Sequence, residues 1–226
     1  MIPLLHDFDG ETVLIFGGGR VGARKARRFA REARVVVVSP DFAGESENDG
    51  DRSDPVEFGD AELVREAPEP ADVGDWFDRV EPALAVAATD SEAINDRVER
   101  EARDRGVLVN RTDEHGARDP GSVVVPATVR DDPVVAAVAT GGASPALSRL
   151  LRQRIETEIA DAGAMAELSG EIRAQLQADG VDPDRRREAV RAVVRSDAVW
   201  KALDSGKPKA RQVAADVISD VTGETA

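Results

Sequence analysis

The sequence contains no cysteine and only two histidines, His6 and His115, among its 226 residues. Without cysteine the chain forms no disulfide bond, no thiolate metal site and no cysteine nucleophile. Two histidines cannot build a multi-histidine site, and we expect no resident metal. The sequence lacks the roughly 18 consecutive apolar residues of a membrane span, and Met1–Asp9 lacks the basic and apolar pattern of a signal peptide. We therefore expect a cytoplasmic protein with no membrane partner.

Positive charge is also scarce, because 30 lysines and arginines face 44 acidic residues and give a formal net charge of -14. This excess of negative charge disfavours nucleic acid or an anionic membrane as a partner. The acidic residues are scattered, and lysine is rare beside arginine. This composition predicts a halophilic surface, adapted to high salt, with an ordinary acidic cytosolic protein as the alternative. The length suits one large domain, or a nucleotide-binding domain with a smaller one.

A glycine-rich stretch near the start of the chain is the strongest local signal. The apolar run Val13–Phe16 leads into three glycines, and the helical pattern that follows places these residues on one face: Val21, Ala26, Phe29, Ala30 and Ala33. Gly17, Gly19 and Gly22 match G-x-G-x-x-G between a strand and a helix. Such glycines allow a tight turn, close approach of a pyrophosphate and close helix packing, and a helix N-terminus attracts phosphate. We predict an NAD site, with a glycine turn without ligand as the alternative. Its residues are Gly17, Gly18, Gly19, Arg20, Val21 and Gly22.

Short apolar runs alternate with helical patterns through the first half of the chain. Three of them suit strands covered on both faces of a sheet: Val35–Val38, Ala83–Ala87 and Val107–Val109. Pro55–Phe58 is a further candidate strand and Asp60–Ala67 a candidate helix. Thr89 and Glu92 have capping-box spacing, so we expect a helix from there to Gly106. The alternation predicts an α/β fold with a Rossmann-type doubly wound parallel sheet.

Polar residues follow the predicted strands, and ligands of doubly wound sheets bind beyond the carboxyl ends of the strands. The residues at these ends are Pro40, Asp41, Thr89, Asp90 and Asn110. Asp41 is a candidate contact to the cofactor ribose, or a turn aspartate after proline; no arginine follows directly that would select a phosphorylated cofactor. Asp113 is our candidate general base, against a loop-capping role, and His115 is the rival base.

The pattern changes near residue 114, where we place the end of the first domain. The apolar runs Ser122–Val125 and Val134–Ala139 flank a turn at Arg130–Pro133 and predict a small antiparallel arm. Ser144 and Pro145 suit the start of a long helix. Its apolar stripe is Leu147, Leu150, Leu151, Ile155 and Ile159. The remaining residues predict an all-helical C-terminal region.

Four segments in this order resemble the precorrin-2 dehydrogenase family, the dehydrogenase and ferrochelatase part of siroheme synthase. They are Phe16–Ala26, Ala87–Asn95, Asn110–Asp113 and Thr140–Arg152. The resemblance covers about residues 1–155, and the rest matches only as a helical region. It implies a homodimer in which residues 1–114 form an NAD-binding Rossmann domain, 115–160 a dimerisation region and 161–226 a helical C-terminal domain.

The resemblance also implies a reaction, the NAD⁺-dependent oxidation of precorrin-2 to sirohydrochlorin, and some members then insert Fe²⁺ to give siroheme. The family's catalytic aspartate falls on Asp113, and its cofactor contacts fall on Gly17–Gly22, Pro40 and Asp41. A serine phosphorylated in a bacterial relative aligns with Thr140, which leaves that regulation open. No preformed iron site is visible in the sequence. This fits a chelatase whose tetrapyrrole supplies the nitrogens, and equally a dehydrogenase without chelatase activity.

The family's substrate is a polycarboxylate, so local positive charge must overcome the negative charge of this chain. Arginine suits this task because its planar fork binds carboxylates bidentately. The candidates are Arg111, Arg130, Arg149, Arg152, Arg154 and Arg185–Arg187. We select Arg111 and Arg149 as substrate-binding residues, together with Gly142 and Ser144, whose turn offers N–H groups at the start of a helix. The alternative is that the arginines only line a solvated helix face.

Two other functions stay open. A Rossmann domain with a helical dimerisation tail also suits an NAD(H)-sensing regulatory module without catalysis, which would need neither the arm nor Asp113 at the cofactor edge. A dehydrogenase of another small molecule would share the same fold.

Overall fold

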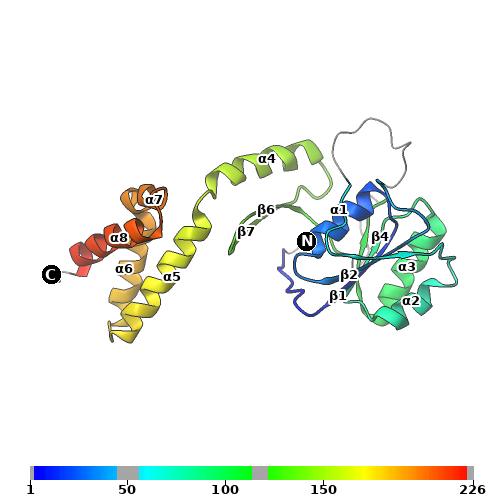
Figure 1. The fold of residues 1–226 in the computed structure, drawn as a ribbon, viewed down its shortest axis with the longest axis horizontal. Helices are drawn as coiled ribbons and strands as arrows, with labels where there is room; N and C mark the ends of the chain where they lie inside the picture. Colours follow the sequence, from blue (N-terminus) through cyan, green and yellow to red (C-terminus); the bar gives the residue numbers. More distant parts are fainter. Residues whose placement is uncertain (1–2, 45–55, 114–121, 223–226) are drawn as a thin grey trace. The chain divides into compact units, whose positions relative to one another are not determined.

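Five parallel strands form the sheet in the first half of the molecule (Figure 1). The computed structural model describes residues 3–44, 56–113 and 122–222, and the strands are β1 (Thr12–Phe16), β2 (Arg34–Ser39), β3 (Glu62–Arg65), β4 (Leu84–Ala87) and β5 (Leu108–Arg111). Their order across the sheet is β3-β2-β1-β4-β5. The chain therefore builds outward from β1 to one side and then returns to the other, which confirms the doubly wound parallel sheet.

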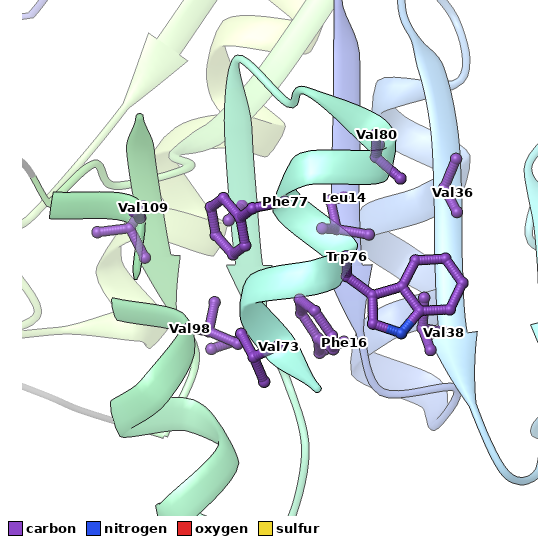
Figure 2. Close-up of a cluster of buried hydrophobic side chains, with 13 residues drawn as sticks. Leu14, Phe16, Val36, Val38, Val73, Trp76, Phe77, Val80, Val98 and Val109 are labelled. Carbon is purple, nitrogen blue, oxygen red and sulfur yellow. The ribbon is translucent and has the colours of Figure 1, made fainter. Parts of the chain in front are cut away.

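Helices cover both faces of this sheet. Helix α1 (Arg20–Phe29) packs on one face through Ala23 and Ala26. Helices α2 (Val73–Val80) and α3 (Glu92–Arg105) pack on the other face. Figure 2 shows this second cluster, in which Trp76 and Phe77 of α2 lie over side chains of the central strands.

The central strands are apolar over most of their length because the sheet is covered on both faces, and their polar residues Thr12, Arg34 and Ser39 lie at the strand ends. Leu14 and Val36 belong to the cluster under α2 and α3, whereas Val13 and Val35 belong to the cluster under α1. All four side chains are at most 2% exposed. Burial of each such side chain stabilises the fold by about 1.5–3 kcal/mol relative to an exposed one, which explains why strands this short define the core.

The prediction was wrong at the third strand. Residues 56–58 form no strand, and Glu62–Arg65, which lies within the predicted helix Asp60–Ala67, is β3 at the sheet edge. It pairs only with β2, and Leu63 stays 42% exposed. An edge strand with charged ends and two apolar residues carries little of the hydrophobic signal that identifies a buried strand. The following helix, α2, was missed for the related reason that it is short.

Two details of the predicted helices also need correction. Helix α3 begins after Ser91, whose hydroxyl accepts a hydrogen bond from the Ile94 N–H, and not after Thr89. Val21 is 37% exposed, because the face of α1 that meets the sheet is formed by its small residues. The predicted end of α3 at Gly106 is confirmed, and this residue takes the left-handed conformation with φ of 70°.

A second compact unit runs from Pro126 to Ala226, the first being Met1–Val125. It contains an antiparallel hairpin of β6 (Ala127–Asp131) and β7 (Val134–Val138), which confirms the predicted arm. The first strand of the arm is not Ser122–Val125, however. That segment belongs to the first unit, where the Val123 N–H donates to the Val109 carbonyl at 2.7 Å.

Residues 139–222 of the second unit contain five helices and confirm the helical C-terminal region: α4 (Pro145–Glu158), α5 (Ala162–Ala178), α6 (Pro183–Arg195), α7 (Asp197–Leu203) and α8 (Lys207–Thr222). Met165 and Leu168 of α5 pack with Val193 of α6 and Val199 of α7 in one buried cluster. None of the helices in the described part of the chain is long and apolar enough to cross a membrane.

Helix α4 differs from its neighbours because none of its residues is buried. Ser144 caps it by accepting a hydrogen bond from the Leu147 N–H at 3.2 Å, and Pro145 occupies its first turn, as predicted. Leu147 and Leu150 of the predicted apolar stripe are each 45% exposed. The stripe is therefore left partly uncovered within the chain.

Candidate functional site

Three of the four loop glycines are required by the packing of the loop itself. Gly17 has a φ of 111°, and a Cβ there would lie 2.2 Å from the Ala88 carbonyl oxygen. A Cβ on Gly18 would lie 2.3 Å from the Asp41 carbonyl oxygen, and one on Gly22 would lie 1.9 Å from that of Gly17. The loop is thus pressed against the chain that leaves β2 and β4, and only hydrogen fits at these three positions.

Gly19 is different, because a Cβ there would meet no atom within 4 Å. This residue is the N-cap of α1, with φ of -71° and ψ of 179°, and no side chain caps the helix. The first turn of α1 also contains no acidic residue. An uncapped helix N-terminus beside open space offers N–H donors and the positive end of the helix dipole to an anion. These residues fit the phosphates of a dinucleotide.

The ends of the strands bring the other predicted cofactor residues to the same edge. Phe16 is paired with Val38 and with Ala87, and Ala87 with Arg111, so four strands end at one level. The predicted residues at or just beyond these ends are Pro40, Asp41, Thr89, Asp90, Asn110 and Asp113. The glycine loop lies against two of these segments, the one after β2 at Asp41 and the one after β4 at Ala88, and so lies at the same edge of the sheet.

Asp41 carries an exposed carboxylate with a cationic neighbour. Its Oδ1 lies 3.5 Å from Nη1 of Arg65, and the Asp41 side chain is 93% exposed. Arg65 also donates to the Pro40 carbonyl at 3.0 Å, and its guanidinium lies over the Phe42 ring, 5.3 Å from the centroid. Strand β3 delivers this arginine from a distant part of the sequence. No arginine directly follows β2 in the sequence, but in the structure Arg65 of β3 lies beside Asp41 at the end of β2.

Asp113 lies just beyond β5, and its side chain is one-third exposed. Arg111 holds both of its oxygens, with Nε donating to Oδ1 at 3.1 Å and Nη2 donating to Oδ2 at 2.7 Å. Asn95 of α3 donates from Nδ2 to Oδ2 at 3.0 Å. The hydrogen bonds from Arg111, and then that from Asn95, lower the pKa of Asp113 below its ordinary 3.8, although partial burial opposes them. Asp113 is therefore ionised at neutral pH. His115, the rival base, lies outside the described residues.

Arg111 is an internal residue, only 5% exposed. Besides Asp113, its Nη1 donates to Asp96 Oδ1 at 2.6 Å and to Glu99 Oε2 at 3.1 Å. These partners, with the hydrogen bonds to Asp113 as the largest cause, raise the pKa of the guanidinium above its ordinary value despite burial. The predicted role of Arg111 in substrate binding needs correction, because its donors face three carboxylates of its own chain. Its place in the structure is the support of Asp113.

Asn95 joins the loop after β4 to Asp113 and is 1% exposed. Its Oδ1 accepts hydrogen bonds from the Thr89 hydroxyl at 2.8 Å and from the Thr89 N–H at 3.3 Å. Its Nδ2 donates to the Thr89 carbonyl at 2.9 Å as well as to Asp113. The backbone and the side chain of Thr89 are thus fixed to the residue that holds the candidate catalytic carboxylate.

Asn110 is 3% exposed and faces the opposite side of β5 from Arg111. Its Nδ2 donates to the Val123 carbonyl at 2.7 Å, which fixes the orientation of the amide. Its Oδ1 is buried without a hydrogen-bond partner among the described residues. A buried acceptor left in this state costs about 1–3 kcal/mol. Within the described part of the chain, the Asn110 side chain therefore keeps an acceptor without a partner close to the sheet edge.

The remaining predicted residues lie in the second unit, around the start of α4. Gly142 has a φ of 85°, and Ser144 is the N-cap. The Thr140 hydroxyl hydrogen-bonds with the Ser148 hydroxyl at 2.9 Å and the Ser144 carbonyl at 3.1 Å, so it holds this turn together. Arg149 is exposed on α4. The turn presents glycine backbone and a helix N-terminus, as the sequence pattern indicated.

Sequence reasoning missed the residues that support the site rather than those that form its surface. Arg65 was missed because β3 was interpreted as a helix, and Asp96 and Glu99 because charged residues on a helix are usually solvated. Asn95 could have been predicted from the sequence. It follows a predicted strand by a few residues and lies in the first turns of the next helix, where a side-chain amide can form hydrogen bonds with residues at the strand ends.

A family described as "Putative NAD(P)-binding" matches residues 4–127 of the chain. A siroheme synthase of Stutzerimonas stutzeri is 34% identical over 229 residues, which is 97% of this chain but 44% of the relative. The chain thus spans less than half the length of that relative. A precorrin-2 dehydrogenase of Methanosarcina barkeri is 30% identical over 220 residues, 96% of this chain and 93% of the relative.

Among solved structures, that of "SirC, precorrin-2 dehydrogenase" matches with a TM-score of 0.66 at 20% identity. The match covers 96% of this chain and all of SirC. At this identity it shows a shared fold, from the parallel sheet through the hairpin to the C-terminal helices. Within the described ranges, no three His, Cys, Asp or Glu side chains are gathered in a way that would hold a metal ion.

Proposed function

Since the chain belongs to the precorrin-2 dehydrogenase family, we propose that it oxidises precorrin-2 to sirohydrochlorin with NAD⁺ as the hydride acceptor. The observation that carries the proposal is the ionised carboxylate of Asp113 at the same sheet edge as the open glycine loop. The oxidation removes a hydride and a proton from the substrate. It therefore needs a hydride acceptor and, beside it, a group that stabilises positive charge on the substrate and accepts the proton.

Bound NAD⁺ supplies the hydride acceptor, and the chain supplies position and electrostatics. The N-terminus of α1 at Gly19 would hold the pyrophosphate, and Asp41 would accept hydrogen bonds from the ribose hydroxyls. Asp113, kept ionised by Arg111, would stabilise the positive charge that the substrate acquires as the hydride leaves. The substrate would then lose its proton to Asp113 and onward to water. The lowered pKa of Asp113 keeps the carboxylate ionised for the electrostatic role.

We propose NAD⁺ rather than NADP⁺ because Asp41 is an exposed carboxylate at the end of β2. A carboxylate there accepts hydrogen bonds from ribose hydroxyls and repels a 2′-phosphate. Arg65 weakens this preference, since its guanidinium lies 3.5 Å from Asp41. The ratio of kcat/KM for NAD⁺ and NADP⁺ tests the choice, and its reversal in favour of NADP⁺ would contradict it.

We further propose a homodimer, with residues 115–160 as the dimerisation region between a Rossmann domain (1–114) and a helical C-terminal domain (161–226). The partly uncovered stripe of α4, with Leu147 and Leu150 each 45% exposed, supports a partner surface there. Arg149 and the turn at Gly142 and Ser144 are proposed contacts to substrate carboxylates. The cytoplasm is the proposed location.

Insertion of Fe²⁺ into sirohydrochlorin is a second proposed activity. Iron would be a substrate here and the tetrapyrrole its ligand. A chelatase of this kind only has to accept the pyrrole protons, and the ionised Asp113 is the described group suited to that task. Sirohydrochlorin incubated with Fe²⁺ or Co²⁺ in the absence of NAD⁺ tests it, because the absorbance spectrum changes on metal insertion.

The decisive experiment is incubation of the purified chain with precorrin-2 and NAD⁺, followed by NADH absorbance. We expect NADH to form with wild type, and Asp113→Asn to abolish its formation while it still binds NAD⁺. Binding of NAD⁺ by wild type without any turnover would favour the alternative function, an NAD(H)-sensing module.

A further inference from the structure

A continuous chain of hydrogen bonds links the cofactor edge to the interior of the first unit through Asp113. Thr89, in the loop after β4, is fixed to Asn95 by three hydrogen bonds of 2.8–3.3 Å. Asn95 donates to Asp113 at 3.0 Å, and Asp113 is held by Arg111 at 2.7 and 3.1 Å. Asn95 and Arg111 are 1% and 5% exposed, so neither is a surface residue that reaches Asp113 by chance.

The geometry leaves the Asp113 carboxylate one orientation. Arg111 contacts both oxygens with a planar fork, which fixes the plane of the carboxylate. Asn95 adds a second donor to Oδ2 from another element, α3. Rotation of the side chain away from this position would break three hydrogen bonds from buried residues, which is costly.

The surroundings of Arg111 explain why it stays in place. Its Nη1 is bound by Asp96 and Glu99 of α3, and Glu99 is in turn paired with Arg103 of α3 at 2.6 Å. Among the described residues, the charged groups of α3 around the pair are two carboxylates and one guanidinium, and the loop after β4 contributes the uncharged Thr89. The two extra carboxylates hold the buried guanidinium in place from its other end, at Nη1, while Nε and Nη2 stay directed at Asp113.

We propose that Asn95 and Arg111 are positioning residues, which keep Asp113 ionised and in a fixed orientation toward the site of the reaction, and that Asn95 couples it to the cofactor-edge loop at Thr89. This inference rests on the proposed function, in which Asp113 is the catalytic carboxylate. It goes further by assigning the support of Asp113 to two named side chains and by predicting how their loss changes its ionisation.

The test compares Arg111→Gln with Arg103→Gln, a control that removes the same charge from the other arginine bound to Glu99, at a residue with no described contact to Asp113. A carbon-13 NMR titration of the Asp113 carboxyl, which needs no substrate, follows its ionisation directly. We expect the titration of Asp113 to move to higher pH in Arg111→Gln and to stay unchanged in Arg103→Gln. The pH dependence of kcat should gain an acid limb in Arg111→Gln but not in Arg103→Gln, with kcat of Arg111→Gln lowered about tenfold to a hundredfold at neutral pH by misplacement of the carboxylate.

A second variant guards against loss of folding in Arg111→Gln, since Arg111 is buried. Asn95→Asp keeps the shape of the side chain but replaces the donor with a carboxylate, so it should also move the titration of Asp113 upward. An unchanged titration in every variant that folds, as judged by circular dichroism, would overturn the inference. Absence of NADH formation by wild type would instead refute the proposed function, and the two failures are thus distinguishable.

Discussion

Replacement of Gly19 by alanine separates a glycine required by a ligand from a glycine required by the fold. A methyl group at this position meets no protein atom within 4 Å, and the backbone, with φ of -71°, suits any L-residue. Reduced freedom of the unfolded chain stabilises such a variant by about 0.4–1 kcal/mol, and the poorer N-cap preference of alanine offsets a similar amount. The free energy of unfolding of Gly19→Ala should therefore stay within about 1 kcal/mol of wild type.

The same methyl group fills the space through which the cofactor phosphates would reach the N–H groups of α1. We expect the dissociation constant for NAD⁺ to rise at least about tenfold, equivalent to about 1.4 kcal/mol of binding free energy. Isothermal titration calorimetry measures this constant, and urea unfolding measures stability on the same preparation.

Two other glycines serve as controls. Gly170→Ala, in the middle of α5, also meets open space, so it should leave NAD⁺ binding unchanged and stabilise the helix by up to about 1 kcal/mol. Gly22→Ala should destabilise the fold itself, because its Cβ would lie 1.9 Å from the Gly17 carbonyl oxygen. If Gly19→Ala bound NAD⁺ as tightly as wild type, the phosphates would not lie at the N-terminus of α1 and the placement of the cofactor would be refuted.

Three further predictions concern charge and surface. Because the pKa of Asp113 is lowered, its ionised form stabilises the fold fully above the ordinary aspartate pKa, and this stabilisation is lost as the pH falls through the lowered value. Asp113→Asn should therefore have a lower Tm than wild type at pH 7. In thermal melts down to pH 3, the difference in Tm between the two proteins should shrink. Leu150→Glu should turn a dimer into a monomer in analytical ultracentrifugation, because it introduces a charge into the apolar stripe of α4. Arg149→Glu is the control, since it changes the charge of the neighbouring residue outside the stripe. A dimer retained by Leu150→Glu would exclude this stripe from the interface. With a net charge of -14, the protein should gain several degrees in Tm between low salt and molar KCl as repulsion is screened, and a Tm independent of salt would contradict the expected halophilic surface.

The parts of the fold predicted from the sequence are those in which one short stretch decides the outcome. Val35–Val38 lies within β2 because four consecutive β-branched residues suit a strand that is covered on both faces of a sheet. The turn before α4 was predicted because Ser144 and Pro145 define a helix start by their own chemistry. The sheet edge as a ligand site followed from topology, since the ends of neighbouring parallel strands must meet.

The parts that escaped prediction depend on partners distant in sequence. Arg111 was selected as a substrate-binding residue because arginine suits carboxylates, yet Asp96 and Glu99 on the preceding helix enclose it. No local pattern distinguishes a carboxylate that faces water from one that faces a buried guanidinium. β3 was lost for a similar reason, because its strand conformation is imposed by pairing with β2 and not by its own residues.

The charges that concealed β3 from prediction also protect the sheet. A β-strand at the border of a sheet has unpaired backbone groups that can recruit a strand from another molecule, and charged side chains on it discourage this. Here Glu62 pairs with Arg34 of β2 at 2.8 Å and Arg65 reaches back to Asp41, so both ends of the short strand carry ion pairs. On the opposite border, the segment at Val123 runs beside β5 and occupies the Val109 carbonyl. The valine-rich central strands are thus bordered on one side by a charged edge strand and on the other by the segment at Val123. Both disfavour the pairing of further strands from other molecules.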